Sequence, residues 1–269
     1  MKILFTDLDD TLLNKQATVS DYSKLVLKRW VEAGNLLVPT SGRPLLSVQK
    51  LINSVGISDL VQYILAYNGA LIWDCQKNEE AWSAKLPVED ARIIQETCFD
   101  MKIHVQTYAN ETIVTPVEDD EIHFYMGKIF LPVEYVPDPI SHIGTKPYKM
   151  LAISLNDKSR LIALQEALSQ KLGDRLNMFF SSPNYFEMVN VHASKGLAGK
   201  ELCKLLNISL SDSYAAGDQE NDLSMIEQMG CGIGMLNAVE TVKHAADVIT
   251  DYDHDHDGLV RFLEDHVEF

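Results

Sequence analysis

Four short polar segments of this chain contain residue types that bind metal ions and phosphate groups. They are Asp7 and Asp9 in DLDDT, Ser41 and Gly42 in TSGR, Lys195 in SKG, and Asp218, Asn221 and Asp222 in GDQEND. Carboxylates can hold a metal ion, whereas hydroxyl, amide and ammonium groups can hold phosphoryl oxygens. A pair of acidic residues in a loop, or a single lysine, is more often only solvated surface. The four segments together indicate chemistry on a phosphate group.

The elements around these segments explain how they could meet. Apolar runs at residues 2–6, 36–39 and 214–216 read as buried strands, and each ends directly before a polar segment. Lys195 opens a predicted helix after Ser194. Because ligands bind beyond the carboxyl ends of the strands in open parallel sheets, we expect these side chains to converge at one edge.

Helical patterns separate the strands. Ser20 is suited to cap a helix that ends near Gly34, and Pro44 suits the first position of a second helix that ends at Gly56. A third strand at 63–66 precedes the turn Asn68-Gly69 and another apolar run at 70–73. Alternating strands and helices predict a parallel sheet with crossover helices.

Between residues 80 and 188 the pattern changes. A helix at 88–98 precedes strands at 103–108 and 112–117, and a segment containing four prolines follows. The block then closes with a strand at 150–155, a helix at 161–172, and strands at 178–181 and 185–191. The parallel-sheet pattern resumes with the helix after Lys195, the strand at 214–216, a helix from Asn221, and strands at 232–235 and 248–250. We therefore predict an α/β, Rossmann-like core domain formed by residues 1–80 and 189–269, with an inserted α+β cap domain at 81–188.

Composition excludes several classes of protein. The 269 residues are 46% hydrophobic and 23% charged, which is typical of a globular chain. The formal net charge of −16 would repel nucleic acids and anionic membranes. The four cysteines form no CxxC pair, and there is no uninterrupted apolar run of about 18 residues. We expect a cytoplasmic protein with reduced thiols; the sequence leaves its oligomeric state open.

The order and spacing of DLDDT, TSGR, the lysine of SKG, and GDQEND resemble the four motifs of the haloacid dehalogenase superfamily. The insert lies between the second and third motifs, and the later segments GIGMLNA, VKHAAD and DGL are similar to the Cof-like phosphatases of subfamily IIB. This resemblance covers nearly the whole chain. It implies an enzyme, a phosphoric monoester hydrolase that acts on a small phosphorylated metabolite.

The resemblance also implies a role for each residue. Asp7 would be the nucleophile that forms an aspartyl-phosphate, and Asp9 would act as acid and base. Mg²⁺ would be bound by Asp7, the backbone carbonyl of Asp9 and Asp218, with Asp222 as a further ligand or an orienting group. The remaining residues would bind phosphate or substrate: Ser41, Gly42, Lys195 and Asn221. The dipeptide Asn68-Gly69 is interpreted first as a tight turn. The resemblance of its segment NGA to that of similar proteins offers a second interpretation, in which Asn68 faces substrate near the cap.

The leading function hypothesis is a Mg²⁺-dependent phosphatase of small phosphomonoesters, with sugar phosphates as the implied class. The cap would close over the substrate through hinges near 78–83 and 187–193. A phosphosugar mutase with the same type of cap, and a sugar-phosphate-binding protein without catalysis, are the alternatives.

Two further features of the sequence need an interpretation of their own. Asp10 occupies a position where similar proteins often have glycine. Asp253, Asp255, Asp257, Gly258 and Glu264 match the calcium-binding loop of an EF-hand. Because a strand, and not a helix, is predicted before that loop, we interpret the match as coincidental.

Overall fold

The structure is a computed structural model that describes residues 1–109, 112–127, 129 and 131–269. The chain forms two compact units. The first comprises Met1–Gly42, Val48–Trp82 and Ser194–Phe269, and the second comprises Arg43–Ser47 and Ser83–Ala193. Each unit has its own sheet and its own hydrophobic core.

Over the described residues, the first unit contains a five-stranded parallel sheet with the order β14-β13-β12-β1-β2. Its strands are β1 (Ile3–Thr6), β2 (Leu36–Pro39), β12 (Ser213–Gly217), β13 (Cys231–Gly234) and β14 (Val248–Ile249). β1 lies in the middle, paired with β2 on one side and with β12 on the other. The first and last segments of the chain therefore share one sheet.

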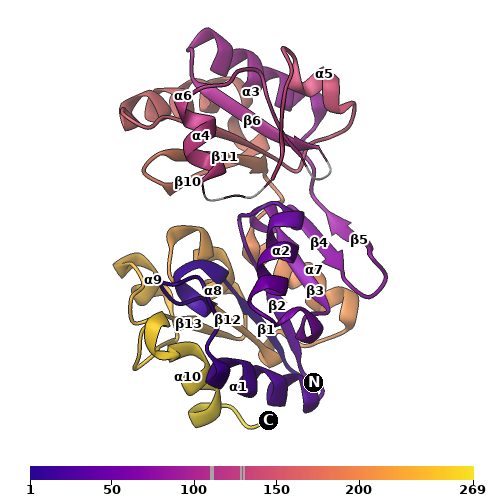
Figure 1. Ribbon diagram of the computed structural model, residues 1–269, viewed down its shortest axis with the longest axis vertical. Helices are drawn as coiled ribbons and strands as arrows, with labels where there is room; N and C mark the ends of the chain where they lie inside the picture. The colour runs from indigo at the N-terminus through magenta and orange to yellow at the C-terminus, as the bar shows by residue number, and fades with distance from the viewer. Residues whose placement is uncertain (110–111, 128, 130) are drawn as a thin grey trace. The chain divides into compact units, whose positions relative to one another are not determined.

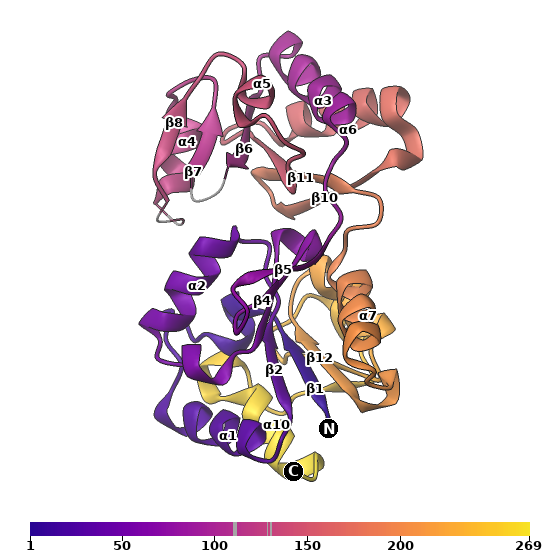
Figure 2. The same ribbon diagram turned by 90° about the vertical axis from the view of Figure 1, so that its right-hand side faces the viewer.

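Helices cover both faces of this sheet (Figures 1 and 2). They are α1 (Asp21–Glu32), α2 (Leu45–Ser54), α7 (Lys195–Leu206), α8 (Leu223–Gln228), α9 (Glu240–Ala245) and α10 (Gly258–His266). On one face, apolar side chains of α7 and α8 pack with Phe5 and Val38 of the sheet. On the other, Trp30 of α1 lies against Tyr214 of β12. Burial on both faces explains why the strands read as continuous apolar runs.

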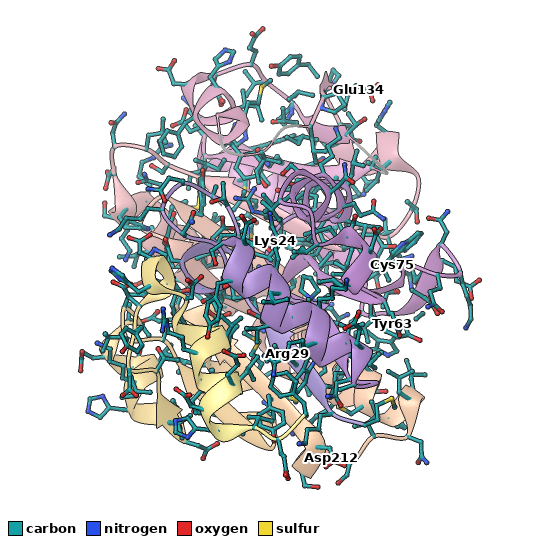
Figure 3. The ribbon with its side chains drawn as sticks, turned by 60° about the horizontal axis from the view of Figure 1, so that its bottom comes forward. Lys24, Arg29, Tyr63, Cys75, Glu134 and Asp212 are labelled. Atoms are coloured by element: carbon teal, nitrogen blue, oxygen red, sulfur yellow. The ribbon has the colours of Figure 1, made fainter. Side chains whose placement is uncertain are left out.

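Local signals fix where several helices begin and end. Ser20 caps α1 by accepting a hydrogen bond from the Ser23 amide at 2.9 Å, and Gly34 follows the helix in a left-handed conformation with φ +83°. Helix α2 begins at Leu45, one residue after the predicted Pro44. Arg29 of α1, labelled in Figure 3, pairs with Glu264 and joins this helix to α10.

The predicted third strand pairs with the apolar run that follows the Asn68-Gly69 turn. β3 (Tyr63–Ala66) pairs antiparallel with β4 (Leu71–Asp74), and β5 (Glu79–Ser83) completes a three-stranded sheet. In the described residues, β3 is linked to the parallel sheet by isolated bridges, including Thr40 with Leu65. The tight turn at Asn68-Gly69 brings the chain straight back, so antiparallel pairing with β4 replaces a crossover.

The second unit contains a six-stranded sheet over the described residues, in the order β10-β11-β9-β6-β7-β8. Its strands are β6 (His104–Ala109), β7 (Thr112–Thr115), β8 (Val133–Tyr135), β9 (Lys149–Ile153), β10 (Leu176–Ser182) and β11 (Tyr185–Asn190). The helices are α3 (Val88–Asp100), α4 (Asp120–Met126), α5 (Pro139–Ile143) and α6 (Lys158–Leu172). Leucines of α6 and apolar residues of α3 pack on one face of the sheet. This is an α+β arrangement. Sequence patterns had not indicated β5, β8, α4, α5, α9 or α10.

No helix within the described part of the chain is both long enough and apolar enough to cross a membrane.

Candidate active site

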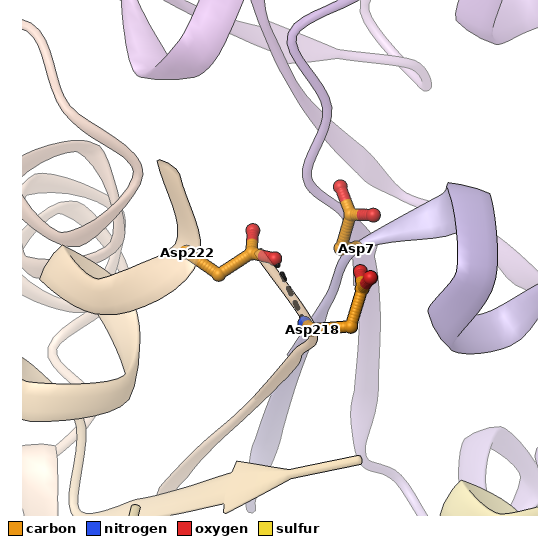
Figure 4. Close-up of side chains that lie close together, drawn as sticks. All are labelled: Asp7, Asp218 and Asp222. Atoms are coloured by element: carbon orange, nitrogen blue, oxygen red, sulfur yellow. Dashed lines mark hydrogen bonds between the residues drawn. The ribbon is translucent and has the colours of Figure 1, made fainter. Parts of the chain in front are cut away.

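Parallel pairing of β1 with β12 brings two distant acidic residues together. Thr6 lies opposite Ala216 in the register, and the Asp7 amide donates to the Ala216 carbonyl at 3.0 Å. Asp7 and Asp218 thus follow neighbouring strands at the same edge, as the sequence had led us to expect. Both are buried, and Figure 4 shows their carboxylates close together.

Lys195 lies at the first position of α7, where Ser194 caps the helix by accepting from the Leu197 amide at 3.1 Å. Its side chain is buried, and Nζ donates to Asp7 Oδ1 and to Asp222 Oδ1, each at 2.5 Å. The ammonium group therefore bridges the acidic residue after β1 and the acidic residue after β12. A cation in this position can also hold phosphoryl oxygens beside Asp7.

Asp222 fixes the shape of the loop after β12. Its Oδ2 accepts from the backbone amides of Asp218 at 3.0 Å and Gln219 at 3.1 Å, and Figure 4 marks the first of these bonds. Gly217 allows the close approach, because a Cβ atom there would lie 2.4 Å from the Asp222 Cβ. Asp222 is fully buried, so this single carboxylate orients both the Asp218 loop and the Lys195 ammonium.

The charges of these groups are strongly coupled. Burial raises the pKa of Asp7 well above its ordinary value; Asp222 and Asp218 add to this effect, whereas Lys195 opposes it. Burial, followed by the charge of Asp222, raises the pKa of Asp218 to about 7. Burial lowers the pKa of Lys195, but Asp222 and Asp7 outweigh burial and hold that pKa above its ordinary value. When they are ionised, the three carboxylates outnumber the one ammonium, and this excess of negative charge favours a divalent cation.

Within the described residues, Asp7, Asp218 and Asp222 are the one group of three or more potential ligands close enough to hold a metal ion. One carboxylate oxygen from each lies within 4.8 Å of the others. The donor set consists of oxygen atoms, which suits Mg²⁺.

Asp9 and Asp10 lie in the turn Leu8–Leu12 that follows Asp7. Asp9 is exposed, and its charge contributes to the raised pKa of Asp7. Asp10 is also exposed and has a left-handed backbone with φ +55°, which explains why glycine would suit this position. Its carbonyl accepts from Asn237 Nδ2 at 2.8 Å.

Ser41 and Gly42 follow β2, and Ser41 is buried. Their connection to the other motifs runs through Asn68: its backbone amide donates to the Ser41 carbonyl at 3.0 Å, and its side chain lies against Gly42. Asn221 Nδ2 donates to Asn68 Oδ1 at 3.2 Å. The four sequence motifs therefore meet within the first unit.

Two residues of this site did not emerge from the sequence. Thr11 Oγ1 donates to Asp218 Oδ1 at 3.1 Å, and Gln219 Nε2 donates to Asp218 Oδ2 at 3.1 Å. Thr11 lies in DLDDT and Gln219 in GDQEND, so their place within these two motifs could have indicated them. Together they orient the Asp218 carboxylate.

The EF-hand-like residues serve another purpose. Protein donors already occupy the carboxylates: Lys15 on Asp255, the Ser20 and Ser23 hydroxyls on Asp257, and Tyr22 and Arg29 on Glu264. Strand β14 precedes this segment, where an EF-hand would need a helix. These residues attach α10 and the loop before it to the N-terminal part of the first unit.

Comparison with known proteins identifies the family. The family model that describes haloacid dehalogenase-like hydrolases matches residues 4–263 of this sequence. The chain belongs to this family.

Its relatives agree with that assignment. The chain is 29% identical to the 5-amino-6-(5-phospho-D-ribitylamino)uracil phosphatase YwtE of Bacillus subtilis, over 98% of this chain and 97% of that protein. It is 27% identical to the phosphatase YwpJ of the same organism, over 93% and 94%. The crystal structure of a haloacid dehalogenase-like hydrolase from Bacteroides thetaiotaomicron superposes with a TM-score of 0.88 at 30% identity, covering 98% of each chain. The predicted family, the α/β fold with its cap and the enzyme class, a phosphatase-type hydrolase, are confirmed.

Proposed function

We propose that this protein is a Mg²⁺-dependent phosphatase that hydrolyses small phosphomonoesters through an aspartyl-phosphate on Asp7. The observation that carries the proposal is the buried contact of Lys195 with Asp7, beside the carboxylates of Asp218 and Asp222. It pairs an acidic side chain with a cation that can bind the phosphoryl oxygens next to it.

The proposed metal ligands are Asp7, the backbone carbonyl of Asp9, and Asp218. Asp222 completes the acidic cluster, and its contacts with Lys195 and two loop amides suit it to orient the site. When bound, Mg²⁺ would reduce the repulsion between these carboxylates and a phosphate and stabilise charge in the transition state.

The chain's own residues account for the bonds made and broken. An oxygen of ionised Asp7 attacks phosphorus, and the bond from phosphorus to the ester oxygen breaks as Asp9 donates a proton to that oxygen. Asp9 then accepts a proton from a water molecule that attacks the phosphoryl group on Asp7. This releases inorganic phosphate and regenerates the carboxylate. Lys195, Ser41 and the Gly42 amide bind the non-bridging oxygens, whose charge must be stabilised in both steps. Asn221 supports this phosphate site.

Sugar phosphates are the proposed substrate class. The name of the relative YwtE describes a substrate with a phosphorylated ribityl chain, which is a small phosphomonoester. The net charge of −16 also fits a small metabolite better than a nucleic acid as the partner. A cytoplasmic location stays a prediction.

The test is phosphate release from p-nitrophenyl phosphate and a panel of sugar phosphates, with Mg²⁺ or with EDTA. We expect release to require Mg²⁺ and to be lost in Asp7→Asn. Asp10→Asn is the matched control: it removes a carboxylate from the same turn, and asparagine tolerates the left-handed backbone at this position. Equal release by the parent and Asp7→Asn would refute the proposal. Isomerisation of a sugar phosphate with little phosphate release would favour the mutase.

A further inference from the structure

The turn between β3 and β4 has an unusual backbone. Tyr67, Asn68 and Gly69 have consecutive positive φ values of +53°, +56° and +86°. Left-handed conformations are unfavourable for residues with a side chain, and asparagine tolerates them better than most. Such conformations persist where their surroundings impose them, so the contacts of this turn are informative.

Gly69 lies directly against the start of α7. A Cβ atom at this residue would be 2.2 Å from the Ser194 carbonyl oxygen and 2.9 Å from the Lys195 amide nitrogen. Any larger residue would displace the segment that holds the Lys195 ammonium. The turn therefore determines how closely the first turn of α7 can approach β3 and β4.

Asn68 contacts the other two phosphate-binding segments. Its amide donates to the Ser41 carbonyl, and its Oδ1 accepts from Asn221 Nδ2 at 3.2 Å. A Cβ atom at Gly42 would lie 2.8 Å from Asn68 Oδ1, so the glycine leaves room for this amide. One turn thus touches the segments that begin at Ser41, Ser194 and Asn221, which are far apart in the sequence.

The position of Asn68 is not explained by folding stability alone. The residue is 2% exposed, and within the described part of the chain Nδ2 has no hydrogen-bond acceptor. A buried donor without an acceptor lowers stability. The left-handed backbone favours asparagine here, but it does not require the side-chain amide to be buried against Gly42 and Asn221. The other end of the same side-chain amide, Oδ1, accepts a hydrogen bond from Asn221 Nδ2.

We propose that Asn68 is a positioning residue of the phosphoryl site, which aligns Asn221 and the Ser41–Gly42 segment with Lys195. The proposal rests on the proposed phosphatase function. It assigns Asn68 no bond to the substrate: Asn68 acts through the groups that it holds.

The main test variant is Asn68→Gly, which removes the side chain while glycine retains the left-handed backbone. Asn207→Gly is the matched control, because Asn207 is also left-handed, with φ +54°, but is exposed at the far end of α7. The assay measures kcat and KM for p-nitrophenyl phosphate with saturating Mg²⁺, alongside urea unfolding. We expect Asn68→Gly to lower kcat about 10- to 100-fold, with a smaller change in KM, since misplaced phosphoryl ligands weaken mainly transition-state binding. Asn207→Gly should stay within about threefold of the parent.

A double-mutant cycle separates positioning from a general loss of structure. Asn221→Ala alone should lower kcat, and adding Asn68→Gly should reduce it little further, because the two side chains act as one unit. The proposal is overturned if Asn68→Gly keeps kcat within about threefold of the parent, if the two losses multiply, or if the loss equals the unfolded fraction. Absence of turnover in the parent itself would instead refute the proposed phosphatase function.

Discussion

Replacing Lys195 with methionine tests the charge balance on which the candidate site depends. Methionine is about as long as lysine and is apolar like the methylene chain of lysine, but it carries no charge. Packing at the start of α7 therefore changes little. The variant leaves Asp7 and Asp222 without the ammonium that lies 2.5 Å from each. The Lys195 side chain is fully buried, so solvent cannot replace it.

The size of the effect follows from this burial. Removing one partner from a buried ion pair costs about 3–5 kcal/mol of unfolding free energy. The direction in which the variant's unfolding free energy changes with pH also follows from the charges at the site. Lys195 lowers the pKa of Asp7, which burial already raises, so its loss raises that pKa further. At pH values above the ordinary pKa of an aspartate, Asp7 then stays protonated in the folded variant but is ionised in the unfolded chain. The folded state binds more protons, so the free energy of unfolding falls as pH rises. We expect the deficit relative to the parent to grow from pH 5 to pH 8. Transition-state stabilisation should fall as well, with kcat/KM reduced about 100- to 1,000-fold.

Urea unfolding in EDTA, followed by tryptophan fluorescence, measures the first effect. All three tryptophans, Trp30, Trp73 and Trp82, belong to the first unit, so the signal reports on the unit that contains the site. Added Mg²⁺ should restore part of the lost stability, because a cation then faces the same carboxylates. Phosphate release with Mg²⁺ measures the second effect.

Lys204→Met is the control, since Lys204 lies on the same helix with its side chain 78% exposed and should change stability by less than about 0.5 kcal/mol. The reasoning is refuted if Lys195→Met unfolds within about 1 kcal/mol of the parent at pH 8 without metal. It is also refuted if the variant retains the parent's kcat/KM.

Three further predictions test the packing and the electrostatics. Gly196→Ala should destabilise the first unit by about 1–3 kcal/mol in urea unfolding, although alanine favours helices, because its Cβ would lie 2.0 Å from the Ser224 carbonyl oxygen; a more stable variant would contradict this contact. Asp10→Gly should keep or raise stability by up to about 1 kcal/mol and Asp10→Val should lower it, since φ is +55°; equal stability of the two variants would argue against the left-handed backbone. In the second unit, hydrogen bonds from the Ser141 hydroxyl, Gln95 and the Ser141 amide lower the pKa of Asp138, so its stabilisation is present above pH 4 and lost as pH falls below that value. Asp138→Asn should therefore weaken the acid dependence of unfolding seen by circular dichroism, and an unchanged dependence would exclude this carboxylate as its source.

Elements with a clear local signal could be predicted from the sequence. The buried strands β1 and β2, the Ser20 cap and the left-handed Gly34 each depend on a few neighbouring residues, and the structure has them within one residue of the predicted positions. The short elements α4, α5 and β8 lack a long periodic pattern, which is why the sequence did not indicate them.

Partners across the fold could not be predicted in the same way. The sequence indicated β3 as a strand, but its antiparallel register with β4 and its isolated bridge to the parallel sheet depend on contacts between different segments. The EF-hand pattern is complete in the sequence, yet its carboxylates bind donors such as Lys15 that come from the opposite end of the chain.

The same distinction between local signals and long-range contacts applies to the candidate site. The order and types of Asp7, Ser41, Lys195 and Asp218 led to the prediction of a phosphate site with a metal, because chemistry constrains those residue types directly; the bound phosphate and metal stay predictions. Only the tertiary structure decided that Asp222 holds both Lys195 and the Asp218 loop. These contacts join segments set side by side by the pairing of β1 with β12 and by the packing of α7, and such long-range geometry has no signature in the neighbouring residues of any one segment.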